Sequence, residues 1–384
     1  MKKHRISTRL IHQRGARLNP PTVNPPIERA STVMFSDPED LYGANPAYGR
    51  MGLSVHRELA AGLCDLEGAA EAILAPNGLA ACALAIASAL RAGDHALVAD
   101  NIYGPTRRFC ERRLDAMGIS ITRFDPRAEP RDLAVLIQDN TRALIIETPG
   151  SLTFELVDTP ALVAFARERG LTTILDNTWS AGLFHKPMAL GVDLSVQALT
   201  KYIIGHADGF GGAVMCRTDA DARKVRACAD DWGLSLAPEE AYSALRGLRT
   251  LETRLARHGQ SGFALAHWLE ARDEVACVLH PGLESHAEHM IWQRDFSGAS
   301  GLFGFVLKPE YEPKARAFLM RLKHFAMGFS WGGYESLLIP CDPQLNRTAE
   351  PHLPDGPLLR VHVGLEAPED LIADLTDAFS ALHE

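Results

Sequence analysis

Short, continuously apolar segments alternate with helical stretches along the chain from about residue 54 onward. Strands that are buried on both faces read as unbroken apolar runs, so this pattern predicts a mostly parallel sheet covered by helices. The expected strands lie at residues 96–99, 143–146, 173–175, 194–196 and 212–215, with helices at 103–117 and 159–169. The apolar run at residues 79–90 is shorter than the about 20 residues that a bilayer span needs, so it predicts a buried helix.

The first 53 residues differ from the rest, because prolines recur in them and almost no helical or alternating period is present. Proline interrupts both kinds of regular structure, so residues 1–53 predict an extended arm, which we expect to contact a neighbouring subunit. Residues 54–256 are expected to form the larger domain. That domain ends in a long helix that begins at Pro238 and carries leucines on one side and arginines, Arg254 among them, on the other.

Residues 257–384 are expected to form a second, smaller α/β domain into which this helix bridges. Its predicted strands lie at 301–307 and 358–363, and its predicted helices at 314–322 and 368–382. The proline-rich stretch at 340–357 predicts a long loop. Long ordered loops tend to border functional clefts, so we expect this one to lie beside the site.

Composition narrows the class of protein. With 384 residues, a net charge of −9 and 46% hydrophobic residues, the chain is typical of a soluble globular protein and not of a basic nucleic-acid binder. The charged first residues are followed by no apolar segment, so no secretory leader is expected, and we place the protein in the cytoplasm without a membrane partner. The 7 cysteines include no CxxC pair and the histidines no HExxH spacing, which favours reduced thiols and argues against a metal site.

Two residues with complementary chemistry follow neighbouring predicted strands. Asp176 follows the strand at 173–175, and Lys201 follows the strand at 194–196. Ligands of α/β sheets collect at the carboxyl ends of strands. An arbitrary Asp and Lys most often form a solvated surface pair. Lys201, however, lies between an apolar run and Tyr202 in a chain with only eight lysines, and burial would lower its pKa and make it a usable amine nucleophile.

Pyridoxal phosphate needs an amine, a carboxylate for its pyridine nitrogen, donors for its phosphate and an aromatic ring to stack on. Lys201 and Asp176 supply the first two, Tyr103 follows the strand at 96–99, and Gly78 opens the helix at 79–90, whose first N–H groups could bind phosphate. A single Gly before a helix is more often only a loop. Arg360 lies between two apolar residues, and either meets a carboxylate inside or points to solvent from an edge strand.

An ordered set of motifs runs along nearly the whole chain: Tyr48-Gly49-Arg50, Pro76-Asn77-Gly78-Leu79-Ala80, Asp176-Asn177-Thr178-Trp179, Thr200-Lys201-Tyr202, Gly247-Leu248-Arg249-Thr250-Leu251 and Ser330-Trp331-Gly332-Gly333-Tyr334-Glu335-Ser336. This set resembles the Cys/Met-metabolism family of pyridoxal-phosphate-dependent enzymes. The resemblance implies a fold type I α/β architecture with a mostly parallel seven-stranded sheet flanked by helices, a smaller C-terminal domain and an N-terminal arm. Residues 54–256 would then be the cofactor-binding domain.

The resemblance also implies roles for individual residues. Lys201 would hold the cofactor covalently and act as catalytic base, Asp176 would pair with the pyridine nitrogen, and Tyr103 would stack on the ring and assist catalysis. The phosphate would be bound by Gly78, Leu79 and Thr200.

Other roles connect subunits and substrate. Tyr48 and Arg50 would reach the phosphate of the adjacent subunit, so the active site would be shared within a homo-oligomer, a homotetramer being expected. The substrate α-carboxylate would be bound by Arg360, with Ser330 and Trp331 beside it.

Two features place the chain near the β-acting branch of the family. The γ-acting relatives typically carry a Leu-like residue at Trp331 and a Ser-Asn-Pro or Thr-Asn-Pro turn in place of residues 147–153. The implied activity is that of a carbon-sulfur β-lyase that cleaves L-cystathionine to homocysteine, pyruvate and ammonia, a transsulfuration step of methionine biosynthesis. A broader cysteine-S-conjugate β-lyase, a γ-lyase and a non-catalytic regulatory protein remain alternatives.

Three departures from the family pattern leave the preferred sulfur amino acid open. A phosphate-binding Ser is replaced by Ala198, a Tyr before the Ser-Trp pair is replaced by Phe329, and Arg107 and Arg108 add positive charge near the expected distal end of the substrate.

Overall fold

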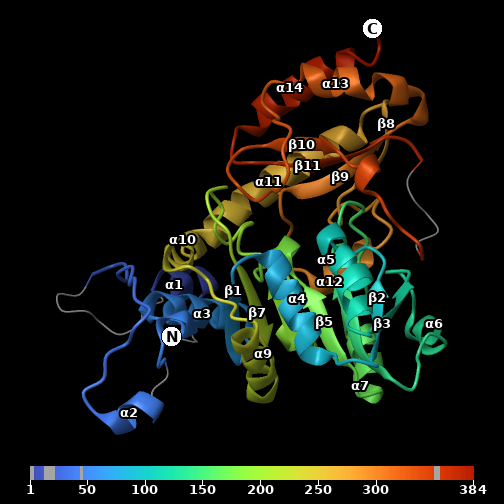
Figure 1. Cartoon of the computed structure of the whole chain (residues 1–384). Coiled ribbons are helices and arrows are strands. Elements are labelled where there is room, and N and C mark those ends of the chain that lie inside the picture. The colour runs from blue at the N-terminus through green and yellow to red at the C-terminus, as the bar shows by residue number, and fades with distance from the viewer. Residues whose placement is uncertain (1–3, 13–21, 44–45, 350–354) are drawn as a thin grey trace.

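The structure is a computed structural model that describes residues 4–12, 22–43, 46–349 and 355–384 (Figure 1). Its larger sheet has seven strands in the order β1-β7-β6-β5-β4-β2-β3. The strands are β1 (Glu71–Ala75), β2 (His95–Ala99), β3 (Ser120–Phe124), β4 (Thr141–Glu147), β5 (Thr172–Asp176), β6 (Leu194–Gln197) and β7 (Gly212–Cys216). Neighbours from β6 to β3 run parallel, whereas β7 is antiparallel to both β6 and β1. The predicted seven-stranded, mostly parallel sheet is therefore confirmed.

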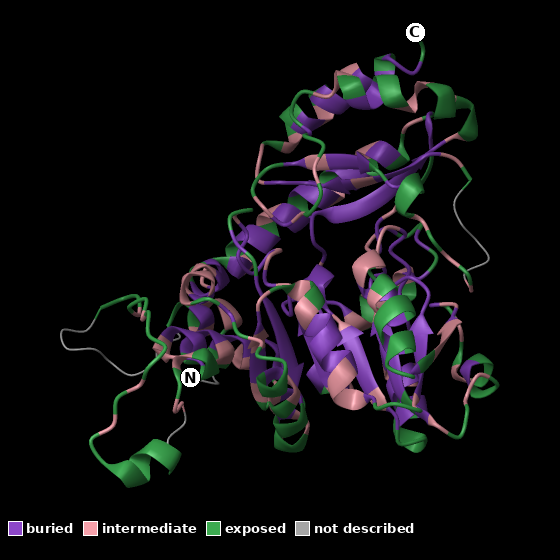
Figure 2. Ribbon diagram, viewed as in Figure 1, coloured by how far each residue is buried: buried purple, intermediate pink, exposed green. Residues whose placement is uncertain are grey.

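Helices cover both faces of this sheet. Val214 and Cys216 of β7 pack in one apolar cluster with α4 (Gly78–Ala89) and α9 (Asp219–Asp231). The alternate residues Ala213 and Met215 pack in a second cluster with α3 (Ser54–Glu67) and α10 (Pro238–Leu248). Successive residues of a strand point to opposite faces, so the sheet is buried on both sides, as Figure 2 shows. The remaining helices around it are α5 (Gly104–Phe109), α6 (Pro130–Ala134), α7 (Thr159–Glu168) and α8 (Pro187–Leu190).

A smaller, antiparallel sheet lies above the first in Figure 1, with the strand order β10-β11-β9-β8. Its strands are β8 (Val275–Leu279), β9 (Leu302–Leu307), β10 (Leu337–Pro340) and β11 (Leu358–His362). The accompanying helices are α11 (Leu251–Glu270), α12 (His289–Asp295), α13 (Ala315–Arg321) and α14 (Pro368–Ser380). Side chains of α11, α13 and α14 share one apolar cluster with this sheet. The strands and helices predicted for the C-terminal part are all present, while the exact division into domains stays a prediction.

The single long helix predicted from Pro238 onward is wrong in one respect, because it is interrupted between α10 and α11. The Gly247 carbonyl accepts a hydrogen bond from Nη2 of Arg254 at 2.7 Å. The same guanidinium also donates to the carbonyls of Tyr202 at 2.7 Å and Ile203 at 3.3 Å. Arg254 is buried, although the helical pattern assigned it to the polar side. Its hydrogen bonds to neighbouring loops compensate for the burial of its charge.

The N-terminal arm also differs from its prediction, since the described part contains α1 (Ile6–Ile11) and α2 (Pro38–Gly43). Leu10 of α1 is buried against α3, whereas α2 buries none of its residues. Residues 1–3, 13–21 and 44–45 of the predicted arm, including Pro20 and Pro21, and residues 350–354 of the predicted loop lie outside the described residues. None of the helices formed by the described residues is long and apolar enough to cross a membrane.

Candidate active site

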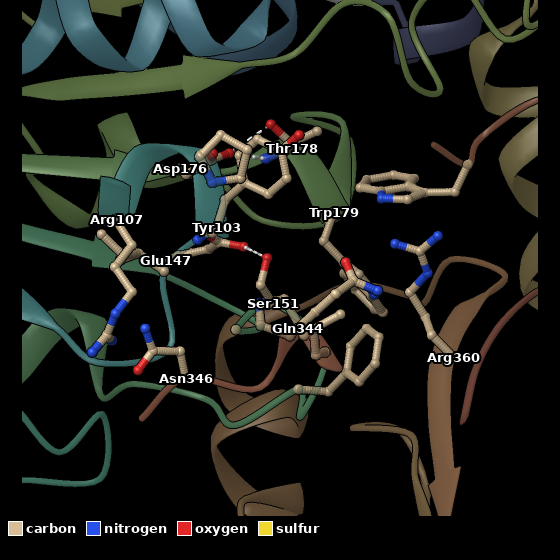
Figure 3. Close-up of a pocket in the computed structure, with 18 of the residues that line it drawn as sticks. Tyr103, Arg107, Glu147, Ser151, Asp176, Thr178, Trp179, Gln344, Asn346 and Arg360 are labelled. Atoms are coloured by element: carbon tan, nitrogen blue, oxygen red, sulfur yellow. Dashed lines mark hydrogen bonds between the residues drawn. The ribbon is translucent and has the colours of Figure 1, made fainter. Parts of the chain in front are cut away.

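A cavity of about 630 Å³ lies between the carboxyl ends of the larger sheet's strands and the smaller sheet (Figure 3). Tyr103 follows β2, Asp176 ends β5, and Lys201 follows β6, so the ends of three strands bring predicted residues to one rim. Arg360 reaches the same cavity from β11 of the smaller sheet. The two sheets therefore enclose the predicted amine, carboxylate, ring and guanidinium in one space.

The Lys201 amine is the group in this cavity best suited to nucleophilic chemistry. Its Nζ donates to Oγ of Ser330 at 2.8 Å and lies 5.2 Å from the centre of the Trp331 ring. Burial lowers the pKa of Lys201 to about 8, and the positive charge of Arg360 adds to this effect. About a tenth of the amine is therefore uncharged at pH 7, far more than at the ordinary pKa of a lysine, as a Schiff-base lysine or a proton acceptor requires.

The turn that contains Ser330 and Gly332 packs directly against the backbone of Lys201. Ser330 has a φ of 77°, which is rare for a residue with a side chain, and its hydroxyl and carbonyl both face the cavity's cations. Gly332 has a φ of 89°, and a Cβ there would lie 2.8 Å from the Tyr202 nitrogen and 2.9 Å from the Lys201 carbonyl carbon. Only glycine fits that approach, so the turn fixes the backbone from which Lys201 projects.

Asp176 and Glu147 form a half-buried acid pair, because they end adjacent parallel strands in register. Oδ1 of Asp176 accepts hydrogen bonds from the backbone N–H of Thr178 at 3.0 Å and from its hydroxyl at 2.5 Å. Oε2 of Glu147 accepts the Tyr103 N–H at 2.6 Å, and Ser151 Oγ donates to its Oε1 at 2.9 Å.

Burial raises the pKa of both acids, and that of Glu147 is raised well above its usual range because the Asp176 charge adds to the effect. Two close carboxylates avoid ionising together. Since Thr178 and the Lys201 charge stabilise the Asp176 carboxylate, Asp176 is the acid of the pair that ionises more readily. Glu147 is not among the residues predicted from the sequence, although its position at the end of a strand, like that of Asp176, was the available signal.

Arg360 lies on β11, which is flanked by β10 and β9. The alternative of an edge-strand arginine directed to solvent is therefore wrong. Its Nη2 donates to the Ser330 carbonyl at 3.0 Å, and burial lowers its pKa. A half-buried guanidinium with donors left over is suited to binding a carboxylate, and Lys201 is close enough for its pKa to respond to this charge.

The predicted phosphate-binding residues lie beside the cavity lining. Asn77 caps α4 by accepting the Ala80 N–H at 2.9 Å, and within the described chain no acceptor is found for the N–H groups of Gly78 and Leu79. A Cβ on Gly78 would lie 2.5 Å from Cβ of Ala198, so glycine is required here too. The Thr200 hydroxyl accepts the Gly211 N–H at 3.1 Å. This helix start offers unpaired donors, which suits a phosphate.

Tyr48 and Arg50 do not line the cavity. Tyr48 is 48% exposed, and Nη1 of Arg50 lies 3.5 Å from Oδ1 of Asp230, with the side chains of Arg50 and Asp230 both partly exposed. Such a surface pair contributes little to stability and leaves both arm residues available. Their role toward an adjacent subunit stays a prediction.

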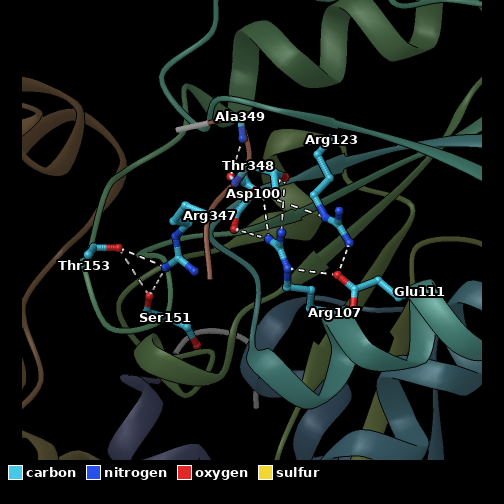
Figure 4. A network of polar contacts seen from close by, with 9 residues as sticks. All are labelled: Asp100, Arg107, Glu111, Arg123, Ser151, Thr153, Arg347, Thr348 and Ala349. Carbon is cyan, nitrogen blue, oxygen red and sulfur yellow. Dashed lines mark hydrogen bonds and ion pairs between the residues drawn. The ribbon is translucent and has the colours of Figure 1, made fainter. Parts of the chain in front are cut away.

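A loop from the C-terminal part closes one side of the cavity, as its proline content predicts (Figure 4). Asp100, which follows β2, accepts the Thr348 N–H at 2.5 Å through Oδ2 and Nη1 of Arg107 at 2.6 Å through Oδ1. Nη2 of Arg347 donates to the Ser151 carbonyl at 2.6 Å. The loop is thus fixed to the larger sheet at two points. Its residues that line the cavity are Pro343, Gln344, Asn346 and Arg347.

The other chemistry-bearing residues form no comparable site. All seven cysteines are free thiols, four of them buried. Within the described part of the chain, no group of three or more His, Cys, Asp or Glu side chains could hold a metal ion.

Comparison with known proteins agrees with the geometry of the cavity. The family of Cys/Met metabolism PLP-dependent enzymes matches residues 7–380. The cystathionine β-lyase of Bordetella avium is 40% identical over 390 residues, which cover 98% of this chain and 97% of that protein. The cystathionine β-lyase of Escherichia coli is 37% identical over 396 residues and covers 100% of both chains. A solved cystathionine γ-synthase of Xanthomonas oryzae aligns with a TM-score of 0.91 and 30% identity over 99% of each chain.

Proposed function

The chain belongs to the Cys/Met-metabolism family of pyridoxal-phosphate-dependent enzymes, and we propose that it is a cystathionine β-lyase. The proposed reaction converts L-cystathionine and water to homocysteine, pyruvate and ammonia, a step toward methionine. The observation that carries the proposal is the cavity in which the Lys201 amine, the Asp176 carboxylate and the Arg360 guanidinium converge. The similarity to β-lyases over 98% and 100% of the chain supports the same reaction.

The residues of the cavity fit pyridoxal phosphate. Asp176 would hold the proton of the pyridine nitrogen, and Tyr103 would lie against the ring. The phosphate would be bound by the unpaired N–H groups of Gly78 and Leu79, with the Thr200 hydroxyl nearby. Ala198 packs at the position where the family's serine hydroxyl would stand, so that hydrogen bond is missing here.

When bound, pyridoxal phosphate supplies an electron sink for the electron pair left on Cα. Lys201 Nζ removes the Cα proton, which its lowered pKa of about 8 allows near neutral pH. Arg360 binds the α-carboxylate and thereby fixes which face of Cα meets Lys201. The indole of Trp331 covers one side of the Lys201 amine, and Ser330 accepts the Nζ hydrogen bond in the cofactor-free protein. The Cβ–sulfur bond breaks, and the thiol leaves with a proton.

The proposed function predicts the products. Purified protein supplied with pyridoxal phosphate and L-cystathionine should release pyruvate and homocysteine in equal amounts, because elimination at Cβ leaves a three-carbon fragment. Parallel assays with L-cystine and L-methionine measure keto acid and free thiol. Formation of 2-oxobutyrate as the main keto acid would identify a γ-lyase instead. A protein that stays colourless with added cofactor and releases no keto acid would point to the non-catalytic alternative.

Arg360→Gln should raise KM for amino-acid substrates by about 10- to 100-fold while changing kcat less. Charge-assisted hydrogen bonds contribute about 1.5–3 kcal/mol, and each 1.4 kcal/mol corresponds to tenfold. Steady-state kinetics of pyruvate release measure both constants. An unchanged KM would contradict the assignment of Arg360 to the carboxylate.

A second readout does not depend on turnover. Arg360 is a cation that disfavours the charged form of Lys201, so its removal should raise the pKa of Lys201 above about 8 in the cofactor-free protein. The pH dependence of Lys201 labelling by an amine reagent measures this shift, whose expected direction is alkaline.

The proposed enzyme is a homo-oligomer, with a homotetramer expected and the active site shared between two subunits. Exposed apolar side chains on the arm support this proposal, since Met34 is 91% exposed and Tyr42 92% exposed. Tyr48 and Arg50 lie on the same arm and would complete a neighbouring phosphate site. The cytoplasm, proposed as the location, is consistent with seven free thiols.

A further inference from the structure

Four arginines line the cavity, and three of them are already committed to protein partners. Arg107 is 3% exposed, and its Nη1 lies 2.6 Å from Oδ1 of Asp100 while its Nε lies 3.2 Å from Oε1 of Glu111. Arg347 is held by the Ser151 carbonyl at 2.6 Å and the Thr153 hydroxyl at 3.1 Å. The side chains of Arg107 and Arg347 therefore stabilise the wall of the cavity.

Arg360 occupies one end of the cavity and Arg107 with Asn346 the other, as Figure 3 shows. Arg360 is bound to the Ser330 carbonyl beside Lys201, so it serves the end of the substrate where the reaction takes place. A substrate whose α-carboxylate meets Arg360 directs its leaving group toward the opposite end, where α5 and the loop with Asn346 meet.

Arg108 is the cavity arginine that remains available. It is exposed, lines the cavity from α5, and forms no ion pair or hydrogen bond with any other described residue. Its charge acts on the neighbouring Tyr103 phenol, which places it at the same rim. The two adjacent arginines noted in the sequence thus differ, because Arg107 is buried and paired whereas Arg108 faces the cavity without a partner.

None of the carboxylates that line the cavity in the described part of the chain forms an ion pair with Arg108. Glu111 is bonded to Arg107 and Arg123. Glu147 accepts hydrogen bonds from Tyr103 and Ser151, and Asp176 accepts two from Thr178. The leaving-group end of the cavity is therefore positive, with the polar side chains of Gln344 and Asn346 beside it.

We infer that Arg108 determines specificity by pairing with a carboxylate at the distal end of the substrate's sulfur substituent. The preferred class is then L-cysteine S-conjugates that end in an anionic group, a class that includes cystathionine. This inference rests on the proposed lyase function. A guanidinium at an exposed rim forms a charge-assisted bond that is partly screened by solvent, so the expected discrimination is about tenfold.

Two isosteric substrates test the inference. S-(2-carboxyethyl)-L-cysteine and its amide, S-(2-carbamoylethyl)-L-cysteine, differ only in the distal charge. The native enzyme should prefer the acid by about tenfold in kcat/KM, and Arg108→Gln should bring the ratio close to one. Arg112→Gln removes the same charge from an exposed position nearby that does not line the cavity, so it should keep the native ratio. An equal ratio in native enzyme and Arg108→Gln would overturn the inference.

A binding measurement separates this inference from the lyase function. L-2-Aminoheptanedioate replaces the sulfur by a methylene and has no leaving group, and its ω-amide is the uncharged partner. Calorimetry on the holoenzyme should give an about tenfold lower Kd for the diacid, and the difference should vanish in Arg108→Gln. If the native enzyme binds both equally, the inference fails. If binding discriminates but no conjugate yields pyruvate, the lyase proposal fails and the role of Arg108 stands.

Discussion

Replacing Lys201 by alanine should abolish lyase turnover, with a loss of at least about 10³-fold in kcat, and should remove the visible absorbance of covalently held cofactor. Lys201 is the one lysine among the described residues that line the cavity, and both proposed roles, attachment point and proton acceptor, would fall to it. Pyruvate release measures the first loss and absorption spectroscopy the second. Borohydride reduction followed by peptide mass spectrometry should locate the cofactor on the native Lys201 peptide.

Lys186 provides a matched control, because burial lowers its pKa as well. Its Nζ donates to the carbonyls of Leu66 at 2.7 Å and Gly182 at 2.6 Å, and it does not line the cavity. Lys186→Met should keep the absorbance and kcat but lower the free energy of unfolding by about 1–3 kcal/mol, since two buried acceptors lose their donor. Cofactor attachment lost from Lys186→Met and kept in Lys201→Ala would refute the assignment.

Asp176→Asn should lower kcat by about 10²- to 10³-fold with a smaller effect on KM. The substitution keeps the size of the side chain but removes the negative charge that would hold the pyridine proton, and electrostatic contributions of this kind have that magnitude. Steady-state kinetics of pyruvate release and equilibrium binding of the cofactor measure the effects on catalysis and on affinity.

Glu147→Gln tests whether Glu147 contributes to kcat through a negative charge or only through its hydrogen bonds. Burial and the Asp176 charge raise the pKa of Glu147 well above its usual range, so its neutral form is favoured. A glutamine can still accept the Tyr103 N–H, so kcat should fall less than about tenfold, the size of a single hydrogen bond. Equal losses in Asp176→Asn and Glu147→Gln would contradict the assignment of the charge to Asp176.

The sequence predicted those parts of the fold that have an unbroken apolar signal. β2 and β7 are buried along their whole length, and each appears in the sequence as an apolar run, continuous in β7 and following His95 in β2. β3 escaped prediction because it is an edge strand with four of its five residues partly or fully exposed, so polar residues interrupt it. The strands β1 and β10, which were not predicted either, are also short and lie at the edges of their sheets.

Residues of the site could be predicted where a reactive side chain directly follows a recognisable strand in the sequence. Lys201 and Asp176 each follow an apolar strand, so their convergence could be expected. The difference between Arg107 and Arg108 could not be predicted. Arg107 pairs with Asp100, and Asp100 also binds Thr348, in a loop 248 residues further along the chain. Long-range contacts of this kind leave no periodic trace in a single sequence.

The break between α10 and α11 has a mechanical consequence. Arg254, in the first turn of α11, binds the carbonyls of Tyr202 and Ile203, the two residues that directly follow Lys201. Leu251 and Leu255 of the same turn pack in one apolar cluster with α3 and α10. The helix that leads into the smaller sheet is therefore anchored, at its start, to the loop that carries the amine.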